Sequence, residues 1–578
     1  MDKGTLKNII DVAAGRKSAD LCIENCKIVD VFNKEVFEGS VLIKDGCVAG
    51  FGGEGFPKAL STFDAKGKYL APGFIDSHVH IESSHCSPAE FSRLVVPCGT
   101  TTVIADPHEI CNVCGVSGLD YMLKASENVP LSVFLQFPSC VPATPFENAG
   151  AILTAKEVAT RIDNERVLGL GELMDYVGTA AADDGILDKL MVAKKAGKVV
   201  DGHSPAIVGS TLDAYSASGV MTDHECATGE ELRERLRRGI YVLLRQGTSC
   251  HDVLNLLKGV DEKNYNRCLF CTDDRQAVSI LTEGHIDNNI RIAIGDGLDP
   301  ITAITMATIN AATCYNLRDR GAVAPGYRAD LVLIDSLENF QIQEVFIKGE
   351  HVASKKNYLV KVESIVPENV RGMVNVKNFS EKRLEYKPKS STVKTIEIIP
   401  GSVVTKIGQA KIDFDEEGRW VRNSDDVVKV AVVERHHGTG NVGVALLQGY
   451  GLKGGAIATS VAHDSHNIIV AGDNDHDMAV AVSSLVQLGG GMVVVKDGQV
   501  VDSFGHEIAG LMTNCSAEEV AKRLEELHEI ALNTLHINSN VDPFMTLCFM
   551  SLPVIPAIKL TDMGLFDVTQ FKFINPEV

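Results

Sequence analysis

Between residues 71 and 324, short apolar runs alternate with longer stretches in which apolar residues recur at helical spacing. Strands that alternate with helices predict a parallel sheet. Eight such units in about 250 residues fit a (β/α)8 barrel of the TIM type. The eight runs are GFIDSHVH (73–80), TTVIAD (101–106), LSVFLQF (131–137), RVLGLGE (166–172), KVVDGH (198–203), GVMTDH (219–224), YVLLRQ (241–246) and RCLFCTDD (267–274).

The flanks of this segment have a different pattern. Residues 20–70 and 329–353 consist of short strand-like runs, with a hairpin signal at Lys44-Asp45-Gly46. We therefore predict a split β-sandwich domain (1–70 plus 325–361) around a barrel domain (71–324). Residues 362–390 are charged and weakly periodic, which indicates a linker. Residues 391–578 combine strands with a helix that begins at Ser516, which predicts a further α+β domain.

Composition narrows the possible partners. The 578-residue chain is 45% hydrophobic and 23% charged, which is ordinary for a globular protein of several domains. Its formal net charge of -21 argues against binding to nucleic acid or to an anionic membrane surface, because both need a basic patch. No signal peptide or membrane-spanning stretch is recognisable, and the 15 cysteines follow no disulfide framework. We expect a cytoplasmic protein that acts on a small molecule.

Ligand-type side chains stand at the carboxyl ends of five predicted barrel strands, where barrel enzymes carry their chemistry. They are His78 and His80 on the first strand, Glu172 on the fourth, His203 on the fifth, His224 on the sixth and Asp273 on the eighth. The spacing agrees with this numbering: His80 to Glu172 is 92 residues and Glu172 to His203 is 31, while one barrel unit is about 30 residues.

These residue types indicate a metal site. His78 and His80 are two positions apart on one strand and so point to the same face. Imidazoles and carboxylates bind Zn, Mn or Fe, and six ligands exceed the need of one metal with an open position. They suit two metals with Glu172 as the bridge. Each residue alone has an ordinary structural explanation, but six at the same end of five strands are hard to explain without a metal.

The motifs resemble those of a known family. GFIDSHVH, DGHSP, TDHE and CTDD are similar to the metal motifs of the amidohydrolase superfamily. Within it the chain resembles the bacterial adenine deaminases over nearly its whole length. The matching stretches are APGFIDSHVHIESS, ADPHEICNV, PSCVPAT, GLGELMDY, LRQGTS, CTDDR and HDSHNIIVAGDND, the last in the C-terminal region that most amidohydrolases lack.

The resemblance implies hydrolysis of adenine to hypoxanthine and ammonia by a metal-activated hydroxide, in purine salvage or catabolism. It implies two divalent metals, with Mn²⁺ or Fe²⁺ preferred and Zn²⁺ as an alternative, and we expect a homodimer. Many relatives in the superfamily bridge their metals with a carboxylated lysine, whereas this chain has Glu172 there. The implied ligands are His78 and His80 for one metal, His203 and His224 for the other, bridging Glu172, and Asp273, which would also shuttle protons as the catalytic residue.

The residues that read the purine are less specified by the sequence. Asp106, His108 and Glu109 follow the second strand and Arg245 ends the seventh, so all four would face the same mouth. Polar groups that pair with a ring edge would discriminate among purines. The alternative is that these residues orient the metal ligands.

Three further points stay open at this stage. The segment containing His463, Asp464, His466 and Asp473 could be a lid over the site or a structural turn. A cyclic amide hydrolase, related to hydantoinase or dihydroorotase, would share the fold and the metals, and its product would be a ring-opened acid. A non-catalytic assembly protein of the same fold should have lost ligands, and here all six positions are filled. The other type of zinc deaminase is excluded because the chain contains no PCxxC.

Overall fold

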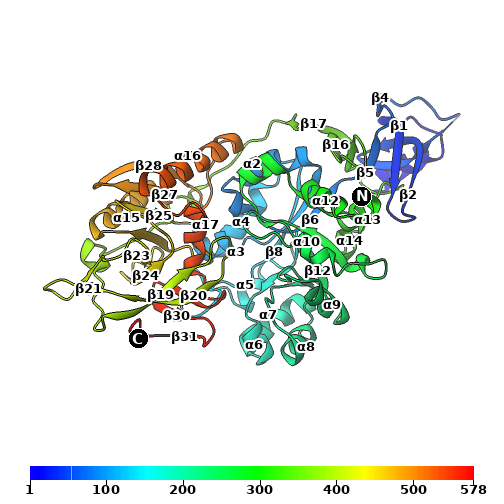
Figure 1. Cartoon of the computed structure of the whole chain (residues 1–578). Helices are drawn as coiled ribbons and strands as arrows, with labels where there is room; N and C mark the ends of the chain where they lie inside the picture. The colour runs from blue at the N-terminus through cyan, green and yellow to red at the C-terminus, as the bar shows by residue number, and fades with distance from the viewer. Residues whose placement is uncertain (54) are drawn as a thin grey trace.

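A ring of parallel strands forms the centre of the computed structural model, which describes residues 1–53 and 55–578 (Figure 1). Hydrogen-bonded ladders join six strands on one side and three on the other. The Met221 amide donates to Val200 O at 2.8 Å and connects the two groups, and Asp273 pairs with Val79 to close the ring. The strands are β6 (Phe74–His80), β7 (Thr100–Ala105), β8 (Ser132–Phe137), β9 (Val167–Leu173), β10 (Val199–Gly202), β11 (Thr222–Asp223), β12 (Tyr241–Arg245), β13 (Cys268–Cys271) and β14 (Asp273–Asp274).

Helices follow these strands and cover the outside of the ring, so the predicted fold class is confirmed. Every residue of β7 and β13 is buried, as expected for parallel strands covered on both faces. The helices are α2 (Pro88–Val95), α3 (His108–Cys114), α4 (Val116–Ala125), α5 (Ala155–Ala159), α6 (Tyr176–Ala180), α7 (Asp184–Lys195), α8 (Gly209–Ala217), α9 (Gly229–Arg237), α10 (Val253–Leu257), α11 (Ala277–Glu283), α12 (Ile286–Gly295), α13 (Pro300–Met306) and α14 (Ile309–Cys314).

Apolar side chains fill the interior of the ring. Ile75, Ile104, Leu243 and Leu269, from four different strands, pack together in one buried cluster. A packed interior of this kind leaves no channel through a barrel of eight strands. The polar side chains that follow these positions along the strands are therefore presented at the carboxyl end only.

Strands from both flanking segments share one nine-stranded sheet. In its centre β5 pairs antiparallel with β15, which brings residues 69–72 beside residues 331–334. The predicted turn at Asp45 and Gly46 joins β2 to β3, and both residues have positive φ. The strands are β1 (Leu21–Asp30), β2 (Glu35–Lys44), β3 (Cys47–Gly52), β4 (Ser61–Asp64), β5 (Tyr69–Pro72), β15 (Leu331–Ile334), β16 (Ile342–Ile347), β17 (Glu350–Ser354) and β18 (Asn357–Tyr358), with helix α1 (Lys3–Ala13) before them.

The C-terminal region is built on an eight-stranded sheet beside the barrel, coloured yellow to red in Figure 1. Its strands are β19 (Thr392–Ile398), β20 (Thr405–Lys411), β23 (Val427–Val433), β24 (Val442–Gln448), β25 (Ala456–Thr459), β26 (Ile468–Gly472), β27 (Gly491–Lys496) and β28 (Gln499–Gly505). Helices α15 (Asp475–Leu488), α16 (Ala517–Leu535) and α17 (Pro543–Cys548) and the small sheet of β29 (Ile558–Thr561), β30 (Gly564–Asp567) and β31 (Lys572–Phe573) complete it. As predicted, Ser516 caps α16, with its side chain accepting from the Glu519 amide.

The C-terminal region is attached to the barrel through the loop that follows β8. Asp562 accepts from the Asn148 amide at 3.0 Å and from Asn148 Nδ2 at 2.6 Å, and Asn467 Nδ2 donates to Asn148 O at 2.8 Å. Leu384, in the predicted linker, is buried in the cluster that also contains Met478 of α15. Across the described part of the chain, no helix has the length and apolarity needed to cross a membrane.

Lys559 on β29 is a buried cation in this region, and it supports a prediction about stability. Its side chain is fully buried and donates to Val403 O at 2.8 Å, and no carboxylate of the described residues forms an ion pair with it. Burial alone lowers its pKa from 10.5 to about 7. The folded protein therefore loses stability at neutral pH, where the unfolded lysine is charged at no cost.

Lys559→Met is expected to raise the unfolding midpoint of the C-terminal region at pH 7 by several degrees. As the pH rises from the folded pKa of about 7 to the unfolded value of 10.5, the free-energy cost of burying the lysine decreases by about 1.4 kcal/mol per pH unit. The advantage of the variant should therefore shrink as the pH rises towards 10.5. Thermal unfolding at pH 7 and near pH 9.5 checks this, and an equal advantage at both pH values would contradict it.

Candidate metal and substrate site

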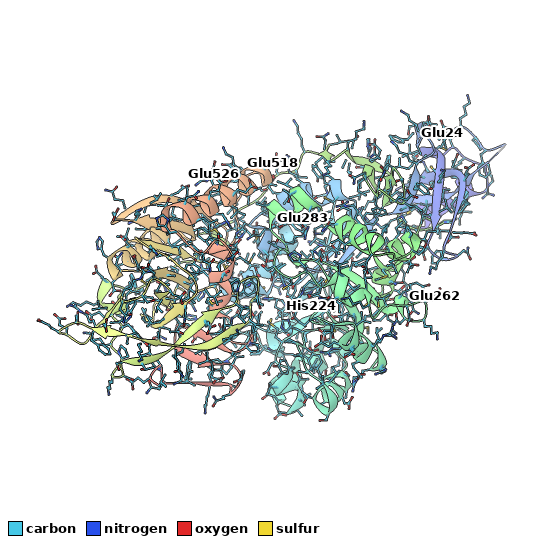
Figure 2. All side chains as sticks on the ribbon, in the orientation of Figure 1. Glu24, His224, Glu262, Glu283, Glu518 and Glu526 are labelled. Atoms are coloured by element: carbon cyan, nitrogen blue, oxygen red, sulfur yellow. The ribbon has the colours of Figure 1, made fainter. Side chains whose placement is uncertain are left out.

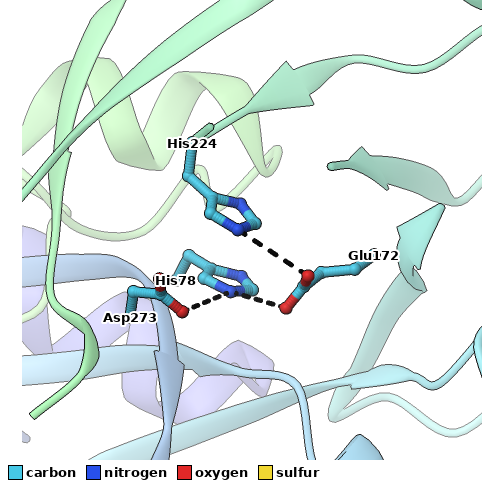
Figure 3. A group of neighbouring side chains, drawn as sticks. All are labelled: His78, Glu172, His224 and Asp273. Atoms are coloured by element: carbon cyan, nitrogen blue, oxygen red, sulfur yellow. Dashed lines mark ion pairs between the residues drawn. The ribbon is translucent and has the colours of Figure 1, made fainter. Parts of the chain in front are cut away.

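Six ligand-type side chains meet at the carboxyl end of the barrel, and Figure 3 shows four of them. We call them the six-residue cluster. Each of them is buried, with at most 7% of its surface exposed. In the view of Figure 2, His224 is labelled near the middle of the molecule and Glu518, on α16, near its upper edge. The cluster consists of His78, His80, Glu172, His203, His224 and Asp273.

Glu172 stands at the centre of the cluster. Its Oε1 lies 3.0 Å from His78 Nε2 and 2.9 Å from His80 Nε2. Its Oε2 lies 2.8 Å from His203 Nδ1 and 3.7 Å from His224 Nε2. Each carboxylate oxygen thus faces one pair of histidines, which is the arrangement expected of a bridging ligand between two cations.

The atoms of the cluster fit a divalent cation better than they fit one another. Glu172 Oε1 and His203 Nδ1 are buried and form no hydrogen bond, in spite of their short distances to neighbours. His78 Nε2 and His80 Nε2 face each other at 3.2 Å. His80 Nδ1 lies 2.8 Å from Asp106 O, a contact that leaves Nε2 free to act as a ligand. A buried set of imidazoles and carboxylates with unsatisfied atoms is chemically suited to a divalent metal.

Asp273 lies between the cluster and a buried arginine. Its Oδ1 is 3.1 Å from His80 Nε2 and 3.6 Å from His78 Nε2, and its Oδ2 accepts from Arg245 Nη1 at 2.8 Å. Burial would raise the pKa of Asp273, but the neighbouring imidazoles of His78 and His80 and the positive charge of Arg245 hold it well below its ordinary value. One oxygen is therefore held in place while the other faces the cluster.

The same balance applies to Glu172. Burial would raise its pKa, but the charges of His224 and His78 and the nearness of His203, whose Nδ1 lies 2.8 Å from Oε2, hold it well below the ordinary value of a glutamate. The centre of the cluster therefore carries a negative charge, as a ligand for a cation requires.

Arg245 and Asp106, predicted as substrate residues, are occupied by protein groups. Arg245 forms ion pairs with Asp273, with Asp252 at 3.0 Å and with Glu225. Asp106 is fully buried, and its Oδ2 accepts from the Glu172 amide at 2.8 Å. Gly171 permits this approach, because a Cβ there would collide with the Asp106 carboxylate. These contacts support the alternative that the sequence left open, that both residues orient the cluster. Arg245 also lines the cavity beside the cluster, and Asp106 Oδ1 has no hydrogen-bond partner among the described residues.

His108 and Glu109, the other two predicted substrate residues, line a cavity of about 70 Å³ beside the cluster. The C-terminal region covers this cavity with residues from several of its loops. The lining residues are His80, His108, Glu109, Glu172, Met174, His203, His224, Glu225, Arg245, Cys250, Asp273, Asp274, Val403, His463, Asp464, Phe549, Leu552 and Ile555.

Two acidic residues of the cavity were not identified from the sequence. Glu225 Oε1 lies 3.5 Å from His224 Nε2 and 3.8 Å from His203 Nδ1. Asp274 accepts from Ser83 Oγ at 2.5 Å. Each directly follows a cluster residue, in TDHE and CTDD, and that adjacency was the available signal. On a regular strand, a residue next to a ligand should point to the opposite face. The sequence pattern alone therefore predicts that Glu225 and Asp274 point away from the cavity.

Residues of the HDSHN segment and the nearby Asp473 have different surroundings: some line the cavity, and others belong to the structure around it. His463 Nδ1 lies 3.1 Å from Glu109 Oε1, and its ring stacks on Phe549 with centroids 4.6 Å apart. Asp464 also lines the cavity. His466 is buried behind it, with Nδ1 accepting from the Ala462 amide. Asp473 accepts from the Gly455 amide at 3.0 Å and belongs to a turn.

Comparison with protein families gives two matches. Residues 69–352 match the model of the amidohydrolase family, and residues 402–572 match that of the adenine deaminase C-terminal domain. The second match lies in the region that contributes His463, Asp464 and Phe549 to the cavity.

Curated relatives match over the full length of the chain. "Adenine deaminase 2" of Desulfotalea psychrophila is 53% identical over 578 residues, which is 100% of both chains. "Adenine deaminase" of Nitratidesulfovibrio vulgaris is 50% identical over 568 residues, which is 98% of both chains. "Adenine deaminase" of Ligilactobacillus salivarius is 48% identical over 579 residues and covers 100% of both chains.

Proposed function

Because the chain belongs to the adenine deaminase family of amidohydrolases, we propose that it hydrolyses adenine to hypoxanthine and ammonia at the six-residue cluster. The observation that supports this most strongly is the central position of Glu172 between two pairs of histidines, beside a cavity that the C-terminal region helps to line.

The proposed ligands follow from these contacts. His78 and His80 would hold one divalent cation, His203 and His224 would hold a second, Glu172 would be shared by both, and Asp273 would complete the site of the first. A divalent metal held there supplies Lewis-acid activation of water at neutral pH. The finer parts of the proposal are two metals per chain, Mn²⁺ or Fe²⁺ in preference to Zn²⁺, and a homodimer.

The side chains of the site move the protons of the reaction. The oxygen of water forms a bond to C6 of adenine and the bond from C6 to the amino nitrogen breaks. One proton of the water ends on the ring nitrogen beside C6, and the other ends on the amino group, which leaves as ammonia. Asp273 is the carboxylate within reach of the cluster that accepts a proton from water and returns it to the leaving nitrogen. Arg245 holds the other Asp273 oxygen, so the carboxylate keeps its orientation during the transfer.

His108 and Glu109 line the cavity and are the proposed contacts to the purine, while Asp106 and Arg245 act as positioning residues. His108 Nδ1 lies 3.8 Å from Glu172 Oε1 and forms no hydrogen bond, so it is free to meet a ring nitrogen. Glu109 Oε2 is likewise buried without a partner among the described residues.

Removal of the metal tests this proposal. We expect purified protein to contain divalent metal and to release ammonia from adenine. Exhaustive chelation should lower that activity at least about 100-fold, and Mn²⁺ or Fe²⁺ should restore it. The thermal midpoint should rise when the metal is added back, since a ligand that binds only the folded state stabilises it. Full activity in protein shown to be metal-free would contradict the proposal, and a ring-opened acid as product would favour a cyclic amide hydrolase.

A further inference from the structure

Asp464 brings a carboxylate from the C-terminal region into the wall of the cavity. Its side chain is 2% exposed. Oδ1 lies 3.7 Å from His108 Nε2 and 3.9 Å from His463 Nδ1. Oδ2 has no hydrogen-bond partner among the described residues.

A buried carboxylate oxygen without a donor is unusual, because desolvation of the oxygen is then uncompensated. Asp567, also in the C-terminal region and also 2% exposed, shows the ordinary case. Its Oδ1 accepts from the amides of Thr569 and Gln570 at 2.9 and 3.0 Å, and its Oδ2 accepts from Gln570 Nε2 at 2.6 Å. Both Asp567 oxygens thus accept hydrogen bonds from their own turn, whereas Asp464 Oδ2 has no protein donor and can accept a hydrogen bond from a ligand in the cavity.

The position of Asp464 indicates which part of a purine would meet it. His108 lies between Asp464 and the cluster, with Nδ1 3.8 Å from Glu172 Oε1 and Nε2 3.7 Å from Asp464 Oδ1. If C6 of the base lies at the cluster, then Asp464 lies further along the cavity, beyond the imidazole ring of His108. Two parts of adenine extend away from C6: the N1–C2–N3 edge, which has no N–H, and the five-membered ring, which has one. A carboxylate oxygen, which accepts hydrogen bonds, can therefore pair only with the five-membered ring.

We propose that Asp464 is a specificity residue whose Oδ2 accepts a hydrogen bond from the N–H of the five-membered ring of adenine. This inference rests on the proposed function. Phe549, Leu552 and Ile555 form the apolar part of the same wall. A site built around such an acceptor rejects bases that lack the N–H, because the buried oxygen then stays unpaired. The C-terminal region would therefore select the free base.

The test compares adenine with 9-methyladenine and 7-methyladenine, neither of which has an N–H in the five-membered ring. We expect kcat/KM of the natural enzyme to favour adenine over both by about 100-fold or more. Asp464→Asn and Asp464→Ala should lower kcat/KM for adenine about tenfold to hundredfold, the range expected for a hydrogen bond to a charged group. The kcat/KM values for the two methylated bases should change less than about threefold, so the preference of the variants for adenine over these bases should be smaller than that of the natural enzyme.

Two further measurements separate this effect from steric exclusion and from misfolding. Asparagine has almost the shape of aspartate, so an unchanged preference in Asp464→Asn would show that exclusion of the methyl group is purely steric and would overturn the inference. Asp567→Asn is the matched control, because it neutralises an equally buried carboxylate outside the cavity. It should lower stability and leave the preference for adenine unchanged.

Binding of purine, which lacks the amino group, gives a readout that does not depend on turnover. Calorimetry should show the natural protein binding purine at least tenfold more tightly than 9-methylpurine, and Asp464→Ala should bind the two within about threefold. If the natural protein neither releases ammonia from adenine nor binds purine, the proposed function and this inference both fail. If it does both and the Asp464 variants keep the natural preference, only this inference is wrong.

Discussion

Asp273→Asn is expected to lower kcat for adenine about 10⁴-fold, the upper end of what a positioned general acid–base group contributes. Asparagine preserves the size of the side chain but cannot accept a proton from water. It also removes a charged oxygen that lies 3.1 Å from His80 Nε2. Steady-state ammonia release, with metal content measured on the same sample, checks the prediction.

Asp252→Asn is the matched control for this experiment. Asp252 Oδ2 accepts from Arg245 Nε at 3.0 Å, just as Asp273 Oδ2 accepts from Arg245 Nη1 at 2.8 Å. Asp252 does not belong to the cluster, so its variant should lose less than about tenfold in kcat. An active Asp273→Asn enzyme would exclude Asp273 as the proton carrier. Equal losses of kcat in both variants would show that Asp273 acts only by holding Arg245.

The barrel and the assembly of the six-residue cluster could be predicted from the sequence because their geometry is local. Each cluster residue lies among the last three residues of a strand or within two residues after it, and the closed ring then brings those ends together whatever the loops do. His78 and His80 needed only the two-residue period of β6, and Glu172 needed only the end of β9. The positions of side chains that depend only on the order of the strands can thus be predicted from sequence patterns.

The other parts of the site depend on contacts that no local pattern encodes. Arg245 ends a strand as predicted, but its guanidinium is neutralised by Asp252, Asp273 and Glu225, which come from three different loops or strands. Asp464 enters the cavity from a region more than 180 residues beyond the last barrel strand. The sequence places the HDSHN motif in a region that most amidohydrolases lack. Only the packing of the C-terminal region against the barrel shows that Asp464 lines the cavity and that His466 does not.

Glu172→Gln is expected to lower kcat/KM at least about 10⁴-fold and to remove at least one metal ion per chain. Glutamine has the same shape, but it presents one neutral oxygen and one amide nitrogen where the cluster now has two charged oxygens. Those oxygens face opposite pairs of histidines at 2.8 to 3.0 Å in three of the four contacts. Loss of the bridging charge should cost several kcal/mol of binding and of transition-state stabilisation, which corresponds to that loss in rate.

Glu147→Gln separates the loss of a bridging ligand from the loss of any buried carboxylate. Glu147 is 4% exposed, against 2% for Glu172, and neither of its oxygens has a hydrogen-bond partner within the described residues. Burial and the nearby charge of Asp464 raise its pKa well above the ordinary value, which favours the neutral form that glutamine resembles. We expect Glu147→Gln to keep its metal and most of its activity. A Glu172→Gln protein with two metals and normal activity would exclude Glu172 as the bridge, because a neutral amide cannot replace a carboxylate shared by two cations.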